Sequence, residues 1–173
     1  MSFYQKLSEV GSKFMSQATL FKYGFNLSPM YRRSTARITE VTDDLMHIKI
    51  RLPINYKNRN YVGSIFGGSM FSAVDPIPMI QVLNILGNDY VVWDKAAEIK
   101  FKRPGRENLY ANFNCTPSEI LNIKNRVENE QEIEIQKLTQ LTNKNGDVVF
   151  CEVSKTIYIA DKEFYKTKRR TKK

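Results

Sequence analysis

A long apolar segment near the middle of the chain limits the possible folds more than any other feature of the sequence. Between Gly68 and Gly87 almost every side chain is apolar, on all sides of a helix drawn through the segment. A helix that is apolar all round is a buried helix, so the rest of the chain must cover it. Gly87 is well placed to end this helix. Pro76 and Pro78 lie inside it and each removes a backbone donor, so we expect a bend there.

The segments on either side of this helix alternate between apolar and polar residues, which is typical of half-buried strands. The alternating runs are residues 33–53, 90–102, 108–116, 131–142 and 148–160. Asp43-Asp44 predicts a turn inside the first run, and Asn145-Gly146 predicts a hairpin between the last two. In the second run we expect one face to carry Val91, Trp93, Ala97, Ile99 and Phe101. A capping box at Thr116-Pro117-Ser118-Glu119 predicts a short helix after the third run.

Together these elements predict an α+β protein with the hotdog architecture, in which a long central helix is wrapped by an antiparallel sheet of about six strands. A long antiparallel sheet has one face to cover, and the buried helix covers it. We expect this domain over residues 25–161, after an amphipathic N-terminal helix in residues 1–24. The open edges of such a sheet favour pairing with a second copy, as a homodimer or a dimer of dimers.

The net charge of +9 is concentrated at the C-terminus, where the last eight residues carry six basic side chains and no acid. The rest of the chain is only mildly basic. Residues 162–173 are therefore expected to form a basic, disordered tail, because residues 166–173 contain nothing apolar to bury. Contact of this tail with nucleic acid or a membrane is the less favoured interpretation, since the chain contains no recognised nucleic-acid-binding motif.

The cysteines and the histidine exclude several kinds of site. Cys115 and Cys151 each lie in an alternating run, so we expect buried free thiols rather than a disulfide framework or a zinc site. His47 is the only histidine and lies on the polar face of a strand. We therefore expect no metal and no cofactor. The chain has no run of about 18 apolar residues and no signal peptide, which predicts a cytoplasmic protein.

The segment that leads into the central helix contains the residues best suited to chemistry. Gly67 and Gly68 open the helix, where backbone N–H groups are unpaired and carry partial positive charge. Such groups suit the oxygen of a thioester carbonyl as it becomes an oxyanion. Asp75 is a carboxylate inside an apolar helix, so it must face a pocket, a partner or a subunit interface. It could act as a general base or a nucleophile, or it could kink the helix by bonding free N–H groups near Pro76. The spacing alone favours neither interpretation.

The same segment resembles a known enzyme family. The sequence Asn60-x-x-Gly63-Ser-x-Phe66-Gly-Gly, with a later acidic residue, is similar to the hotdog-fold acyl-CoA thioesterases of the phenylacetate-degradation (PaaI-like) type. Those enzymes have Asn-x-x-Gly-Thr-x-His-Gly-Gly. Residues 60–76, 86–106 and 145–159 are more closely similar to a bacterial hotdog family known only as a domain of unknown function. This resemblance covers about residues 25–160.

The resemblance implies a thioesterase that hydrolyses acyl-CoA or a related acyl thioester. Asp75 would activate water, the N–H groups of Gly67 and Gly68 would hold the oxyanion, and Asn60 would position the water or the acid. Substrate contacts are expected from Gly63, Phe66, Lys100, Lys102, Arg103 and Arg106. The four basic residues cluster at a strand end and suit the phosphates of CoA, or they form a solvated strand end. Phe66 replaces the family's histidine and cannot donate a hydrogen bond, so a non-catalytic acyl-CoA or fatty-acyl binding protein is the alternative.

Overall fold

The structure is a computed structural model that describes residues 15–171. Six strands of the described chain form one antiparallel sheet in the order β1-β2-β4-β5-β6-β3. The strands are β1 (Arg37–Val41), β2 (His47–Leu52), β3 (Tyr90–Phe101), β4 (Leu109–Asn114), β5 (Glu132–Thr142) and β6 (Val149–Asp161). The helices are α2 (Gln17–Leu27), α3 (Pro29–Arg33), α4 (Gly67–Val74), α5 (Pro76–Leu86), α6 (Pro117–Glu130) and α7 (Lys162–Thr171).

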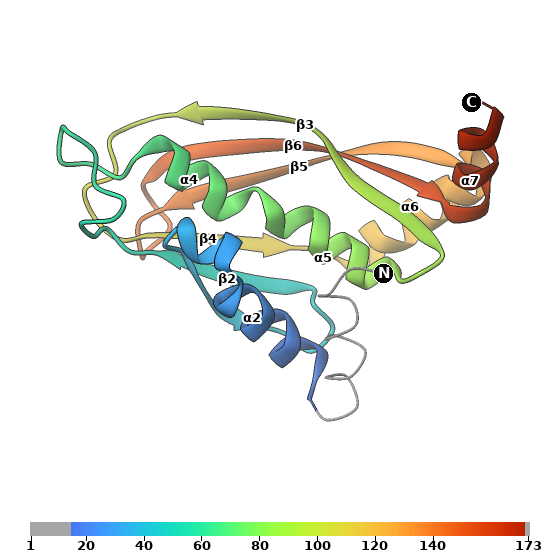
Figure 1. Cartoon of the computed structure of the whole chain (residues 1–173), viewed down its shortest axis with the longest axis horizontal. Coiled ribbons are helices and arrows are strands. Elements are labelled where there is room, and N and C mark those ends of the chain that lie inside the picture. Colours follow the sequence, from blue (N-terminus) through green and yellow to red (C-terminus); the bar gives the residue numbers. More distant parts are fainter. Residues whose placement is uncertain (1–14, 172–173) are drawn as a thin grey trace.

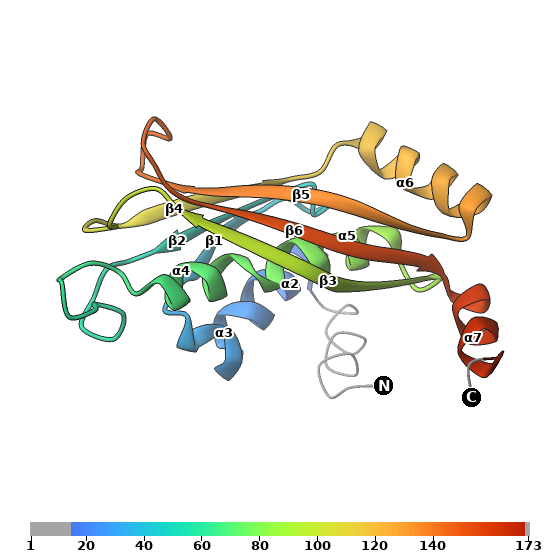
Figure 2. The ribbon, with the colours of Figure 1, turned by 90° about the horizontal axis from the view of Figure 1, so that it is seen from above.

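The sheet curves around α4 and α5, which run one after the other along one face of it (Figure 1). Inward-facing residues of the strands, such as Ile48, Ile50 and Leu52 of β2, are fully buried against this helical layer. Seen from above, α3 lies on the far side of the central helix from the sheet (Figure 2). The α2 helix packs beside the edge strand β1, where Asn26 accepts a hydrogen bond from the N–H of Ile38 at 2.9 Å. The predicted α+β arrangement of about six antiparallel strands around a central helix is therefore confirmed.

The predicted bend divides the central helix in two. The α4 helix ends at Val74 and α5 begins at Pro76, with Asp75 between them. The buried hydroxyl of Tyr31 donates to the carbonyl of Ala73 at 3.0 Å, which ties α3 to the end of α4.

By length and hydropathy alone, the Gly67–Leu86 stretch could also cross a membrane. Half of its most apolar window is buried inside the domain, where the sheet wraps around it. The central helix is therefore buried in part and is not covered on every side.

A β-bulge in β3 changes which side chains face the central helix. Asp94 lies opposite the buried Ile157, and the register of β3 against β6 shifts directly after this pair. Trp93 lies on the other face of the sheet, where it stacks on a tyrosine of β6. The prediction that Val91 and Trp93 share one face with Ala97 and its successors is therefore wrong. An extra residue in a strand reverses the alternation beyond it, and the apolar pattern of this run did not reveal it.

The basic C-terminal segment is helical over residues 162–171, so the prediction of disorder is wrong there. The Asp161 carboxylate accepts hydrogen bonds from the N–H groups of Glu163 and Phe164 and so caps α7. Tyr165 packs edge-on against Trp93, with ring centroids 5.0 Å apart. Lys168 pairs with Glu132 of β5 at 2.5 Å. The tyrosine just before the basic run supplies the apolar contact that the run itself lacks.

At the N-terminus, residues 1–14 of the predicted amphipathic helix lie outside the described residues. The described helix α2 begins after Ser16, whose hydroxyl accepts from the N–H of Thr19.

Several local predictions are confirmed. The hydroxyl of Thr116 accepts from the N–H of Glu119 at 3.1 Å and caps α6. Gly146 has a φ of 82°, as the predicted hairpin turn requires. Cys115 and Cys151 are buried and free, and burial raises the pKa of the Cys151 thiol to about 11.

Candidate functional site

The loop before α4 is held by its own hydrogen bonds. The side-chain oxygen of Asn60 accepts from the N–H groups of Val62 and Ser64 at 3.1 and 3.0 Å. Gly63, between them, has a φ of 77°, a conformation that side chains other than glycine disfavour. All hydrogen bonds of the Asn60 side chain stay within this loop, so the structure does not bring Asn60 into contact with Asp75. Within the described chain Asn60 and Gly63 shape the approach to the helix.

The start of α4 presents free backbone donors. Phe66 is the N-cap residue and provides no side-chain hydrogen bond to the helix. The N–H groups of Gly67 and Gly68 have no hydrogen-bond partner among the described residues. Unpaired N–H groups at a helix start attract negative charge. These are the two donors that the sequence assigns to an oxyanion.

Two phenyl rings lie directly against these glycines. A Cβ atom on Gly67 would be 2.7 Å from Cζ of Phe101, and one on Gly68 would be 2.3 Å from Cε1 of Phe66. The rings of Phe66 and Phe101 are nevertheless 59% and 56% exposed. The two glycines are therefore needed to seat the rings, and the rings form an open apolar wall beside the free N–H groups. Phe101 was not among the predicted site residues, because it comes from the far end of β3.

Asp75 lies at the break of the central helix and pairs with a buried lysine. Its carboxylate makes no hydrogen bond to the start of α5, so it does not bond the N–H groups near Pro76. Instead, its Oδ1 binds Nζ of Lys155, on β6. The Lys155 side chain is only 1% exposed, and its Nζ also donates to the carbonyl of Asp75 at 3.1 Å. The Asp75 side chain is 38% exposed, so this carboxylate is partly open to solvent.

A second carboxylate completes this cluster. Oδ2 of Asp94 lies 2.8 Å from Nζ of Lys155, while its Oδ1 is buried without a hydrogen-bond partner in the described chain. Burial raises the pKa of Asp94; Lys155 opposes this rise and the Asp75 carboxylate adds to it. Neither Lys155 nor Asp94 was among the predicted site residues. The sequence contains one signal for them: Lys155 takes an inward position in the alternating run 148–160, and a buried lysine needs an acidic partner.

The basic residues at the end of β3 divide into paired and unpaired groups. Lys100 and Lys102 pair with Glu98 and Glu152 at 3.3 and 2.8 Å. The two arginines of the following loop, Arg103 and Arg106, are exposed and make no ion pair within the described chain. The N–H of Ile65 donates to the carbonyl of Gly105 at 2.8 Å, so this loop lies against the one that leads into α4. Both loops lie at the same end of the molecule as the start of α4 (Figure 2).

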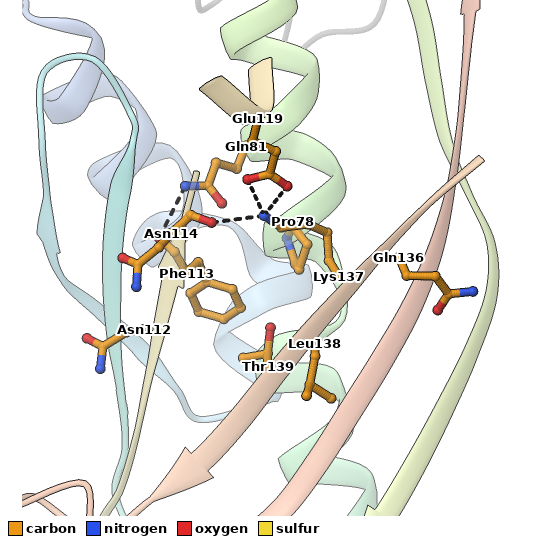
Figure 3. A pocket seen from close by; sticks show the side chains of 10 residues that line it. All are labelled: Pro78, Gln81, Asn112, Phe113, Asn114, Glu119, Gln136, Lys137, Leu138 and Thr139. Carbon is orange, nitrogen blue, oxygen red and sulfur yellow. Dashed lines mark hydrogen bonds and ion pairs between the residues drawn. The ribbon is translucent and has the colours of Figure 1, made fainter. Parts of the chain in front are cut away.

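A separate polar cavity of about 190 Å³ lies between β4 and β5. These strands share one residue pair, so they diverge and leave an opening over α5. Gln81, Glu119 and Lys137 gather at one side of this cavity (Figure 3). Oε1 of the fully buried Gln81 has no hydrogen-bond partner in the described chain. Asp75 does not line this cavity, and its polar walls do not suit an acyl chain. No group of three or more His, Cys, Asp or Glu side chains within residues 15–171 could hold a metal.

The chain has the fold of several solved structures, all at low sequence identity. A Pseudomonas aeruginosa protein of unknown function, described as a probable thioesterase, has a TM-score of 0.72 and 18% identity, covering 85% of this chain and 98% of its own. A thioesterase from Haemophilus influenzae has a TM-score of 0.60 and 13% identity, over 86% of this chain and 94% of its own. A hypothetical thioesterase from Streptococcus pneumoniae, solved with coenzyme A, has a TM-score of 0.50 and 16% identity, over 73% and 86%. These likenesses show the hotdog fold.

No curated protein matches the chain. A family described as "Domain of unknown function (DUF4442)" matches residues 17–159, which is most of the chain and includes the central helix and all of the sheet except the last two residues of β6. The protein therefore belongs to the DUF4442 family.

Proposed function

We propose that this protein is a thioesterase that hydrolyses acyl-CoA or a related acyl thioester. The observation that carries the proposal is Asp75, a partly exposed carboxylate at the break of an apolar helix whose first N–H groups are unpaired. Water would attack the thioester carbonyl while Asp75 takes its proton. The N–H groups of Gly67 and Gly68 would stabilise the oxyanion. The thioesterase descriptions of the structural neighbours agree with this chemistry.

The spacing along the central helix supports a site that two copies of the chain assemble. Asp75 follows Gly68 by seven residues, and a helix rises about 1.5 Å per residue, so the two lie roughly 10 Å apart along the axis. A carbonyl group that contacts a water on Asp75 would have to span almost this whole distance to present its oxygen to Gly68 of the same chain, which favours a site shared between two copies. The site would therefore use Asp75 of one subunit and the helix start of the other. We propose a homodimer, or a dimer of dimers, with the cleft between subunits.

Groups around the helix start suit the rest of the substrate. The exposed rings of Phe66 and Phe101 would contact the acyl group next to the carbonyl. The exposed Arg103 and Arg106 are free to bind the phosphates of CoA, whereas Lys100 and Lys102 already pair with acids. Of the four basic residues, the two arginines are thus the stronger candidates.

A second candidate function is non-catalytic binding of acyl-CoA. The observation that favours it is the pair of phenyl rings against Gly67 and Gly68. One of them, Phe66, stands where the similar thioesterases have a histidine that can donate a hydrogen bond. Such a wall would hold an acyl chain without taking part in hydrolysis.

A thiol-release assay across acyl-CoAs, from acetyl to palmitoyl and aryl, separates the two functions when it is combined with a binding measurement by calorimetry. The enzyme releases CoA from at least one member of the panel. A protein that binds an acyl-CoA tightly and releases none would be the binding protein instead. A monomeric mass by light scattering at micromolar concentration, together with full activity, would contradict the shared cleft.

A further inference from the structure

The cluster of Asp75, Lys155 and Asp94 joins three separate elements at one point. Asp75 lies between α4 and α5, Lys155 is on β6, and Asp94 is on β3. Asp94 reaches the cluster because it lies opposite Ile157, which is on the same face of β6 as Lys155, and the bulge follows directly after Asp94. Bulges occur often beside active sites, where they redirect a side chain. Within the described chain no other charged group contacts these three.

The contacts leave the two carboxylates in different states. One oxygen of Asp75 is bound by Lys155, and Oδ2 has no hydrogen-bond partner in the described chain. The side chain is 38% exposed, so Oδ2 is the oxygen available to a water molecule. One oxygen of Asp94 is likewise bound by Lys155, but its other oxygen is buried. Asp75 can therefore meet a substrate water, and Asp94 can act only through Lys155.

We propose that Lys155 and Asp94 are positioning residues that set the strength of Asp75 as a base. Lys155 fixes Oδ1 of Asp75 through an ion pair and leaves Oδ2 to face a water molecule. Asp94 offsets the charge of Lys155, so that Asp75 is not fully neutralised and can still accept a proton. A lysine paired with Asp75 alone would make it a weak base, and two carboxylates without the lysine would hold a proton between them. This inference rests on the thioesterase function proposed above.

The two residues then have opposite effects on the pH dependence of hydrolysis. In Asp94→Asn the acid limb of the kcat/KM profile should move to lower pH, by about one pH unit. In Lys155→Met it should move to higher pH by a similar amount. A structural role alone would change stability and expression but would not move the two profiles in opposite directions.

Matched controls are available on the neighbouring strand. Lys137 lies opposite Lys155 in the β5–β6 register and pairs with Glu119 rather than with Asp75. Glu134 is exposed and pairs with Lys95, the residue after Asp94. Lys137→Met and Glu134→Gln make the same changes of charge and should leave the acid limb where it is. If Lys155→Met does not fold, the double variant Lys155→Met/Asp94→Asn is used in its place, because it removes one charge of each sign.

A direct titration separates this inference from the proposed function. In protein labelled with ¹³C at aspartate carboxyl carbons, the titration midpoint of Asp94 should rise in Lys155→Met and should fall in Asp75→Asn. In the control Lys137→Met the midpoint should not change. An active enzyme whose acid limb does not move in Asp94→Asn would overturn the positioning role. So would a titration midpoint of Asp94 that is the same in Asp75→Asn as in wild type. A wild-type protein that shows the coupled titration and hydrolyses no thioester would instead contradict the thioesterase function.

Discussion

The ring of Phe101, at the end of β3, lies against Gly67, the first residue of α4, so closely that a Cβ there would be 2.7 Å from it. This contact joins the edge strand to the start of the central helix. It places an exposed aromatic ring beside the free N–H groups that are proposed to hold the oxyanion.

Gly67→Ala is expected to disturb the site more than the fold. The added methyl group must displace the Phe101 ring, which is 56% exposed. The free energy of unfolding should change by less than ~1 kcal/mol, while the KM or dissociation constant for acyl-CoA rises several-fold. Thermal unfolding and calorimetry measure the two effects. The matched control is Gly24→Ala in α2, where nothing lies within 4 Å of the added atom and ligand binding should not change. Equal effects of both substitutions on binding would contradict this role for the ring.

Phe66→His restores the polar group that the similar thioesterases have at this position. The ring is 59% exposed, so the variant should fold. An imidazole beside the oxyanion site should leave kcat unchanged or raise it, since one good donor in such a site is worth up to about 10²–10³-fold. Steady-state kinetics on the preferred acyl-CoA give the answer. A variant that only binds the ligand more weakly would favour the binding protein.

Tyr165→Ala should loosen the C-terminal helix. Tyr165 contacts Trp93, the only tryptophan of the chain, so intrinsic fluorescence reports on this contact directly. We expect a red-shifted emission and a loss of about 0.5–1.5 kcal/mol of stability. Tyr23→Ala replaces a tyrosine that is 53% exposed, and it should leave the emission unchanged. An unchanged spectrum in Tyr165→Ala would show that α7 does not pack on the sheet.

Asp94→Asn should change how stability depends on pH. Because the pKa of Asp94 is raised in the folded protein, the folded state holds its proton more tightly than the unfolded state. The contribution of Asp94 to stability is therefore present below its usual value of 3.8 and is lost as the pH rises through the higher folded value. The melting temperature of the variant, measured relative to wild type, should increase between pH 4 and pH 7. Glu134→Gln should show no such trend, and a difference that shrinks over this range would contradict the raised pKa.

The local features of the fold could be predicted from the sequence because they depend on neighbouring residues. The break at Asp75 follows from Pro76, and the cap of α6 follows from Thr116 and Glu119. The face of β3 could not be predicted past Asp94, since a one-residue bulge leaves an alternating pattern on both sides of it.

The candidate site could be predicted from the sequence only where a single segment contains its residues. The free N–H groups of Gly67 and Gly68 follow from their place at a helix start. Lys155 contacts Asp75 from 80 residues away, and no local pattern relates the two. The helix α7 could not be predicted from the basic run alone, because its anchor Tyr165 precedes that run and contacts Trp93 on a distant strand.

The release of CoA by wild type and by Asp75→Asn tests the central claim most directly. On the acyl-CoA that wild type hydrolyses best, the variant should lose about 10²–10⁴-fold in kcat, with a circular dichroism spectrum and oligomeric mass that match wild type. A folded Asp75→Asn protein that releases CoA at the wild-type rate would contradict the account.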